Sequence, residues 1–356
     1  MDSIRRKYRK QLEEGFPPEL RVIFGDEDIA YKKILSLRYG ENPHQPAALY
    51  RPLDGLLTVG NLREVKTGKG GLSQTNVMDM NHALSIVKYF DDPACAVMKH
   101  LNPSGVALSR GQRESLKDIY MRARDCDSQA AFGSVVGFNE EVDGETAEEL
   151  LSTFVEAVVA PSFRDEAIEL FQLKKGLRVI EVGSLEGTSR FIGDDPQPYV
   201  FSALMDGSLI VSTPLLTKVH GPEDLRTVTK RKPNRKEAED LVFSWYVCMN
   251  VRSNGVVVSK DRGTLGIGTG QQDRVTAVKL ALEKAVDRGH GEDLDGAVLA
   301  SDGFFPFPDS ITLMGEYGVS ACVQPGGSVK DKEVMEACNE FGIAMVLTDE
   351  RCFSHF

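Results

Sequence analysis

The chain has 356 residues, of which 41% are hydrophobic and 27% charged, so it is long enough for one large core or two smaller ones. Its formal charge of −11 argues against generic nucleic-acid binding, which needs a basic face. No apolar run approaches the roughly 18 residues of a membrane span, and the charged start is unlike a secretory signal, so we expect a cytoplasmic protein without membrane contact. The six cysteines form no C-x-x-C pair, which predicts reduced, mostly buried thiols and no metal site.

Strand-like and helix-like segments alternate through the first half of the chain. This alternation is typical of an α/β sheet covered by helices. Apolar residues at helical spacing predict helices over 76–90, 113–124, 146–154 and 165–175, and short β-rich runs predict strands over 94–98, 134–138, 156–160 and 177–182.

The alternation breaks between about 185 and 235, where a Gly-, Asp-, Pro- and Ser-rich stretch precedes the basic run TKRKPNRK. We interpret the basic run as a solvated loop and place the boundary between two lobes in this region, giving lobes 1–200 and 201–356. The alternation then resumes, with helices predicted over 237–251, 273–286, 311–318 and 332–342 and strands over 255–260, 296–301, 320–324 and 344–348.

Polar clusters follow several of the apolar strands, at the positions where open α/β sheets place ligands. The glycines of GIGTGQQDR lack the G-x-G-x-x-G spacing, which argues against nicotinamide binding, although Arg274 could still supply a planar donor fork to a ligand. The clusters are LRYGENPHQ (37–45), KHLNPSG (99–105), RSNG (252–255), GIGTGQQDR (266–274), SDGFFPFPDS (301–310) and the terminal DERCFSHF (349–356).

In ACAVMKHLNPSG an apolar strand ends at Lys99 and His100. The segment that follows contains Pro103 and Gly105, and we interpret it as a loop. The pair has two readings. It is either a strand end with a solvated lysine and a structurally bonded histidine, or an acid–base pair in which histidine takes a proton and lysine stabilises an oxyanion. No G-x-S-x-G motif is present, so the second reading suits acyl transfer without a covalent enzyme intermediate.

SDGFFPFPDS places phenylalanines around a proline directly after a predicted strand, together with Asp302 and Asp309. Core packing explains part of this apolar content. The remaining rings could form the wall of a site for a flat heteroaromatic ligand. The pattern alone leaves both readings open.

In this order, the clusters resemble those of aminoimidazole carboxamide ribonucleotide (AICAR) formyltransferase, the transformylase half of a bifunctional enzyme of purine biosynthesis. The resemblance runs from about residue 35 to the end and also includes AFGSVVGFN, EAVVAPSF, VTKRKPNRKEAEDLVFSW, QPGGSVKDKEV and EFGIAMVLTD. It implies an α/β fold of two cytidine-deaminase-like lobes, each a mixed sheet covered by helices, and a homodimer with sites at the interface. It brings no zinc, because the H-x-E and P-C-x-x-C ligands are absent.

The resemblance implies formyl transfer from 10-formyltetrahydrofolate, as co-substrate, to the 5-amino group of AICAR. By that analogy His100 is the base, Lys99 stabilises charge on the formyl oxygen, and Asn254 orients His100 and the formyl group. A supporting monovalent cation or Mg²⁺ is left open, because no residue pattern indicates one. The implied nucleotide-binding residues are Arg38, Tyr39 and Arg351, chiefly for the phosphate, with Asn76, Gly133, Glu156, Arg274, Phe304 and His355, and the implied folate-binding residues are Phe132, Val275, Pro306 and Asp309.

The sequence also departs from this family. About 35 residues precede LRYGENPHQ, so we expect no cyclohydrolase domain and a separate protein that closes the ring to IMP. Ser104 stands where cysteine is common, Pro308 replaces a basic residue, and 190–213 lacks the usual G-G-L-L. The alternatives are a paralogue with the same nucleotide pocket and another one-carbon donor, and a non-catalytic purine-ribonucleotide-binding protein. The intact Lys99, His100 and Asn254 favour a working enzyme.

Overall fold

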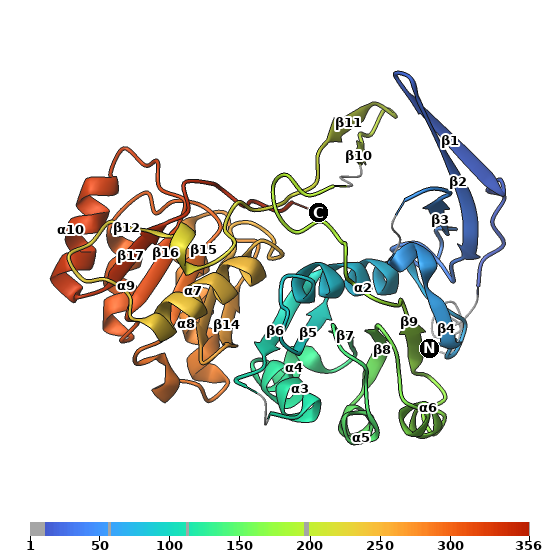
Figure 1. Ribbon diagram of the computed structural model, residues 1–356, viewed down its shortest axis with the longest axis horizontal. Helices are drawn as coiled ribbons and strands as arrows, with labels where there is room; N and C mark the ends of the chain where they lie inside the picture. The colour runs from blue at the N-terminus through green and yellow to red at the C-terminus, as the bar shows by residue number, and fades with distance from the viewer. Residues whose placement is uncertain (1–10, 56–57, 112–113, 196–198, 356) are drawn as a thin grey trace. The chain divides into compact units, whose positions relative to one another are not determined.

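The computed structural model describes residues 11–55, 58–111, 114–195 and 199–355 (Figure 1). Contacts divide the chain into two compact units, the first reaching Glu186 and including Arg262–Thr264, the second formed by Gly187–Asp261 and the residues from Leu265 onward. Both units combine a mixed sheet with helices, which confirms the predicted α/β class. The likeness of each lobe to cytidine deaminase and the boundary at residue 200 stay predictions.

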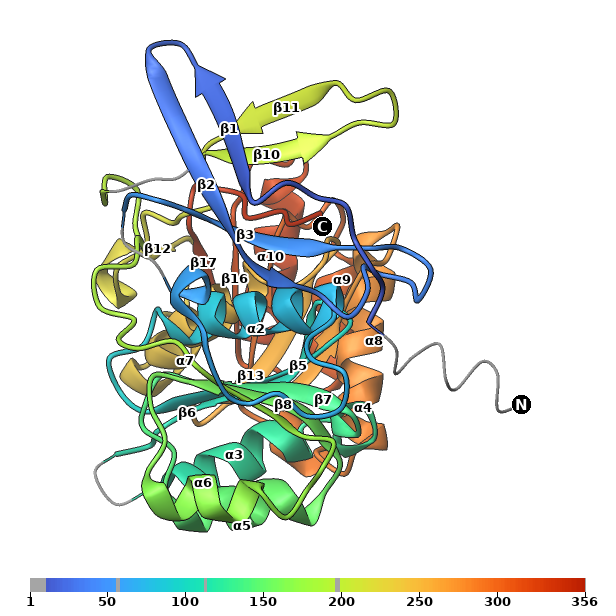
Figure 2. The same cartoon turned by 90° about the vertical axis from the view of Figure 1, so that its right-hand side faces the viewer.

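The main sheet of the first unit has the strand order β6-β5-β7-β8-β9-β4. Strands β7, β8 and β9 run parallel, with α5 and α6 as the crossovers that parallel neighbours require. Figure 2 shows α2 on one face of this sheet and α3, α5 and α6 on the other. The strands are β4 (Arg63–Lys66), β5 (Ala94–Lys99), β6 (Asn102–Leu108), β7 (Ser134–Phe138), β8 (Val155–Ala160) and β9 (Arg178–Glu181), and the helices are α2 (Gln74–Val87), α3 (Leu116–Asp125), α4 (Ser128–Ala131), α5 (Gly144–Ser152) and α6 (Asp165–Phe171).

A separate antiparallel sheet of the first unit, in the order β1-β2-β3, was not predicted. Its strands are β1 (Glu19–Phe24), β2 (Glu27–Ser36) and β3 (Ala48–Pro52), and the short helix η1 (Val59–Asn61) follows them. None of the three strands has a buried residue, so they lack the alternation of buried and exposed side chains from which a strand is usually predicted. β2 leads directly into the LRYGENPHQ segment.

One local prediction was wrong. The segment after His100 is not a loop, because Asn102–Leu108 forms β6 and pairs antiparallel with β5. Lys99 pairs with Asn102, so the connection consists of only two residues. The proline that suggested a loop lies opposite a register shift between Val97 and Met98, a place where a sheet tolerates proline.

The sheet of the second unit has the order β12-β17-β16-β15-β13-β14, with β15, β16 and β17 parallel. Helices α8, α9 and α10 contribute to one buried cluster with these strands, and α7 packs against β13 and β15. Its strands are β12 (Arg226–Thr227), β13 (Val256–Lys260), β14 (Gly263–Gly268), β15 (Val298–Ser301), β16 (Ala321–Gln324) and β17 (Ala344–Leu347), and the helices are η2 (Pro222–Asp224), α7 (Arg235–Cys248), α8 (Arg274–Asp287), η3 (Glu292–Leu294), α9 (Asp309–Glu316) and α10 (Asp331–Phe341). Strands β10 (Val200–Ala203) and β11 (Leu209–Ser212) form a separate antiparallel sheet.

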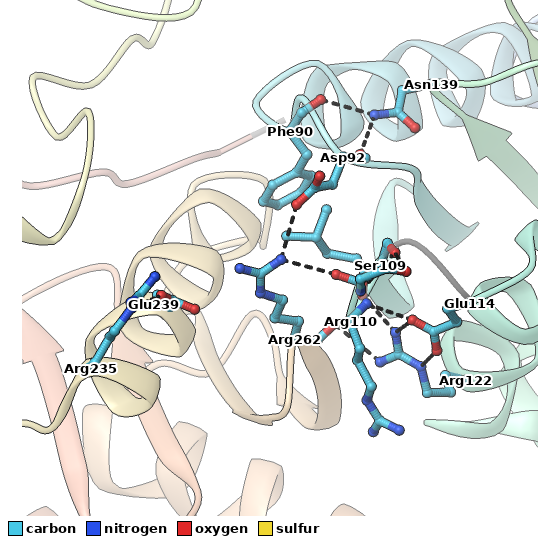
Figure 3. A network of polar contacts seen from close by, with 12 residues as sticks. Phe90, Asp92, Ser109, Arg110, Glu114, Arg122, Asn139, Arg235, Glu239 and Arg262 are labelled. Atoms are coloured by element: carbon cyan, nitrogen blue, oxygen red, sulfur yellow. Dashed lines mark hydrogen bonds and ion pairs between the residues drawn. The ribbon is translucent and has the colours of Figure 1, made fainter.

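The first residues of β14 belong to the first unit, far along the chain from the rest of it. Arg262 donates through Nη1 to Asp92 Oδ2 at 3.0 Å, as Figure 3 shows. Gly263 pairs with Ala107 of β6. The segment Arg262–Thr264 therefore pairs with β6, the strand at the end of the first unit's sheet.

All six cysteines are buried free thiols, which confirms the prediction made from their spacing. The basic run TKRKPNRK is only partly a solvated loop. Arg231 donates to the carbonyl oxygen of Ser320 at 3.0 Å, and Asn234 caps α7. Among the described residues, no helix is both long and apolar enough to cross a membrane.

Candidate active site

His100 and Leu101 are the two central residues of the tight turn between β5 and β6. Their φ angles are 53° and 66°, the sign that a type I′ hairpin turn requires at both positions. Asn-Gly is the favoured sequence there, because other residues are strained at positive φ. The turn leaves His100 exposed, and the neighbouring Lys99 donates through Nζ to the carbonyl oxygen of Phe132.

Helix α2 places two polar side chains, Asn76 and Asp79, one turn apart on its buried face. Asn76 donates through Nδ2 to Glu156 Oε2 of β8 at 3.1 Å. Asp79 accepts from the backbone N–H of Leu101 at 2.7 Å. One helix face thus connects the predicted nucleotide-binding residues with the turn that carries His100.

The carboxyl group of Asp79 has a raised pKa. Burial raises its pKa to about 6, and the nearby Glu156 carboxylate adds to that rise. The N–H of Leu101 and the ammonium group of Lys99 oppose it. A carboxyl that titrates close to neutral pH is a frequent feature of functional sites. Sequence reasoning missed Asp79, although its spacing of three residues from Asn76 in NVMD was a usable signal.

Two buried arginines of the first unit, Arg38 and Arg178, lie close to each other. Arg38 donates to the hydroxyl oxygen of Tyr39 at 3.1 Å, and its guanidinium lies 4.6 Å from the centre of that ring. Arg38 and Arg178 both donate to the carbonyl oxygen of Lys69, at 3.4 and 3.0 Å. Burial, and next the charge of Arg38, lower the pKa of Arg178. Sequence reasoning missed Arg178 because it lies inside a predicted strand.

This arginine pair has spare capacity for an anion. Within the described part of the chain, Nε of Arg38 is buried and has no hydrogen-bond partner. Paired guanidinium groups with a free N–H suit a phosphate oxygen, because both their charge and their fork geometry match it.

Gly133 and Phe132 complete the group in the first unit. Gly133 has a φ of 73°, and a Cβ there would lie 3.5 Å from Lys99 Nζ and 3.3 Å from the ring of Phe154. The ring of Phe132 packs 5.2 Å from that of Phe154 but stays 63% exposed. The first unit therefore gathers Arg38, Tyr39, Asn76, Lys99, His100, Phe132, Gly133 and Glu156, together with the unpredicted Asp79 and Arg178.

The second unit is organised around a buried ion pair. Arg274, the first residue of α8, donates through Nη1 to Asp302 Oδ1 at 2.5 Å. Its Nη2 donates to Asn254 Oδ1 at 2.6 Å. Asp302 is fully buried and accepts from the N–H of Gly255 at 2.8 Å. RSNG, GIGTGQQDR and SDGFFPFPDS thus meet at one place in this unit.

The Asn254 side chain is fixed at both ends of its amide. Its oxygen accepts from Arg274, and its Nδ2 donates to the carbonyl oxygen of Gln271 at 2.9 Å. One N–H and one lone pair of the amide remain beyond these two bonds. The residue is therefore rigidly held and still able to make a further hydrogen bond.

The terminal DERCFSHF segment packs against the same place. The N–H of Ser253 donates to the carbonyl oxygen of Ser354 at 3.0 Å. The Arg351 guanidinium lies 4.3 Å from the centre of the Phe353 ring, and the exposed His355 ring lies 5.8 Å from it. The ring fits because Gly303 has no side chain, since a Cβ there would lie 2.6 Å from Phe353.

The phenylalanines of SDGFFPFPDS are divided between the core and the surface. Phe305 is fully buried in the core of the second unit, whereas Phe304 and Phe307 are 42% and 52% exposed. Asp309 begins α9 and is exposed. The second unit therefore gathers Asn254, Arg274, Phe304, Arg351 and His355. Of the predicted folate-binding residues, Val275 and Asp309 lie at the starts of α8 and α9, and Pro306 lies in the loop before α9.

These elements describe a mixed α/β chain with two clusters of polar residues at strand ends. The chain belongs to the family described as AICARFT/IMPCHase bienzyme, whose model matches residues 3–284. Among curated relatives, the bifunctional purine biosynthesis protein PurH of Caldicellulosiruptor bescii is 42% identical over 90% of this chain and 59% of its own length. That of Aquifex aeolicus is 42% identical over 93% and 62%. The chain thus spans about 60% of the length of these relatives.

A solved structure from Thermotoga maritima, a diaminohydroxyphosphoribosylaminopyrimidine deaminase/5-amino-6-(5-phosphoribosylamino)uracil reductase, is 25% identical over 28% of this chain and 31% of its own. The TM-score of that match is 0.22, which is too low to support any statement about the fold.

Proposed function

We propose that this chain is an AICAR formyltransferase of purine biosynthesis, with 10-formyltetrahydrofolate as formyl donor. Membership of the AICARFT/IMPCHase family supports the reaction class. The observation that carries the proposal is the exposed His100 beside Lys99, on a two-residue turn bonded to the helix that also holds Asn76.

In the proposed reaction the 5-amino nitrogen of AICAR attacks the formyl carbon of the donor. His100 accepts the proton that the amine loses, and the Lys99 ammonium stabilises the negative charge that develops on the formyl oxygen. The bond between the formyl carbon and N10 then breaks, and tetrahydrofolate leaves with a proton on N10. Asn254 supplies its remaining hydrogen-bonding capacity to orient the reacting groups.

The nucleotide would be held through charge and through fixed hydrogen bonds. Arg38 and Arg351 match a phosphate group, because both are guanidinium groups next to an aromatic ring and Arg38 has a spare N–H. Asn76 and Glu156 suit the ribose and the base, since they are bonded to each other in a fixed geometry. The exposed rings of Phe132 and Phe304 suit flat ligands.

We further propose a homodimer with sites at the subunit interface. This follows from the family resemblance. A second candidate is a paralogue that keeps the nucleotide pocket and uses another one-carbon donor. Pro308 favours it, because this uncharged residue caps α9 directly before Asp309.

A spectrophotometric assay of the purified chain tests the proposal by following release of tetrahydrofolate from the donor in the presence of AICAR. We expect turnover that needs both substrates, with formyl-AICAR as the product. No turnover, with AICAR binding intact by calorimetry, would favour another donor or a non-catalytic binder over the proposed reaction.

A further inference from the structure

The residue types of the turn that carries His100 do not favour its backbone conformation. Both central residues have positive φ, and Leu101 is a residue that rarely adopts this conformation. Conformations of this kind persist only when the surrounding structure holds them. The His-Leu turn, in a position where Asn-Gly is favoured, must therefore be fixed by contacts from outside the β5–β6 hairpin.

The described structure contains one strong contact of this kind. The Asp79 carboxylate, 6% exposed, accepts from the N–H of Leu101 at 2.7 Å. A bond from a backbone N–H to a carboxylate is charge-assisted and stronger than a neutral one. The other contact to the turn is weaker, because Asn102 Nδ2 donates to the carbonyl oxygen of His100 at 3.2 Å in a partly exposed position.

The Lys99 ammonium group is bonded elsewhere, because Lys99 Nζ donates to the carbonyl oxygen of Phe132. The contact of Asp79 with the β5–β6 hairpin is therefore the one to the backbone N–H of Leu101.

We propose that Asp79 is a positioning residue for the reaction, which holds the His100–Leu101 turn in its strained conformation through the N–H of Leu101. This inference rests on the proposed formyl transfer. Asp79 does not touch the reacting atoms and acts through Leu101.

Three variants separate the hydrogen bond from its charge. Asp79→Asn keeps an oxygen that can accept from Leu101 N–H but removes the negative charge that strengthens this bond, and Asp79→Ala removes the bond altogether. We expect kcat to fall about tenfold and about 100-fold respectively, because small displacements of catalytic groups are costly, with the KM for AICAR within about twofold of the parent. In Asp79→Ala/Leu101→Gly, glycine accepts positive φ, so about tenfold of the lost kcat should return.

Asp143→Ala is the matched control. Asp143 also accepts from one backbone N–H, that of Thr146 at 2.9 Å, in the same unit but at the start of α5. Its loss should lower Tm while kcat stays unchanged. An equal fall of kcat in Asp143→Ala and Asp79→Ala would show a general loss of structure and overturn the proposal, as would an Asp79→Ala protein with normal kcat.

A second measurement does not depend on the reaction. Amide hydrogen exchange at Leu101 should be much faster in Asp79→Ala than in the parent and close to the parent rate in Asp79→Asn. Unchanged exchange at Leu101 in Asp79→Ala would refute the positioning role. If the parent protein shows no turnover, the proposed function fails, and the exchange rates still decide whether Asp79 holds the turn.

Discussion

The two clusters of candidate residues are stabilised in opposite ways. In the first unit Asp79 is a buried carboxyl that has no direct ion pair with any described residue, and its pKa is raised to about 6. In the second unit Asp302 is also buried but is paired directly with Arg274 at 2.5 Å. A buried charge with a well-placed partner is locked in one state, whereas one held by a backbone N–H and a more distant charge can still change state. The first cluster is therefore the adjustable one, and the second is a fixed frame.

The largest effect should come from the exposed base of the first cluster. His100→Ala should lower kcat about 1,000-fold, because general-base catalysis typically contributes 100- to 10,000-fold, while AICAR affinity measured by calorimetry stays the same. His290→Ala, in the turn after α8, serves as the control and should retain full activity. A His100→Ala protein with near-normal kcat would remove His100 from the mechanism.

The fixed frame of the second cluster should respond in stability. Asp302→Asn leaves the Arg274 guanidinium buried without its counter-charge, so the free energy of unfolding should fall by about 3 kcal/mol in urea denaturation. Asp349→Asn breaks the pair between Asp349 and Arg226, both about half exposed, and should cost less than about 1 kcal/mol. Equal losses from the two variants would mean that burial does not distinguish these ion pairs.

The adjustable cluster should show the reverse effect of a charge removal. The folded state raises the pKa of Asp79 from 3.8 to about 6, so it binds the proton more tightly than the unfolded chain does. The corresponding stability is present below about pH 4 and is lost as the pH rises through about 6. Asp79→Asn, which stays neutral, should therefore be more stable than the parent at pH 8, by at most about 3 kcal/mol.

The same two proteins should have equal stability near pH 4, where the parent carboxyl is protonated. Urea denaturation at both pH values measures the difference, which the negative charge of Glu156 increases and the positive charge of Lys99 reduces. A stabilised but slower Asp79→Asn enzyme would distinguish a positioning role from a purely structural one. A variant that is less stable at pH 8 would contradict the raised pKa.

The smallest expected effect concerns an exposed phosphate contact. Arg351→Ala should raise the KM for AICAR about tenfold and leave kcat nearly unchanged, because a uniform binding contact is lost. Arg235→Ala, whose side chain is 94% exposed and paired only along α7, should leave both constants unchanged. If the KM does not change in Arg351→Ala, Arg351 does not bind the phosphate.

The sequence predicted most of the regular core of both units, because these helices and strands have clear apolar periodicity. Gly137, for example, lies in a strand predicted over its full length, β7. Strand β14 was missed although all its residues are buried, because its glycines suggested a loop. Strand β6 was missed because Pro103 and Gly105 are signals of a loop, and only the register shift in its partner makes them compatible with a strand. Strands β1 to β3 were missed because they have no buried face.

Several residues of the candidate site could be proposed from the sequence, but the hydrogen bonds that join them could not. Polar residues after an apolar strand led to Lys99 and His100, and Asn254 came only from the family resemblance. Asp79 lies within a helix and Arg178 within a strand, so neither carries that signal. The buried bond between Arg274 and Asp302 joins the starts of two segments far apart in sequence, and no local pattern encodes such a meeting.

The return of Arg262–Thr264 to the first unit has a consequence for synthesis of the chain. A ribosome releases residues in order. The partner of β6 in Arg262–Thr264 therefore emerges only after the rest of the first unit and after Gly187–Asp261 of the second unit. Until then the edge of β6 offers unpaired backbone groups that could join a neighbouring nascent chain. The first half of this protein is therefore finished late, and a fragment ending at Glu186 should be prone to aggregation in the cell.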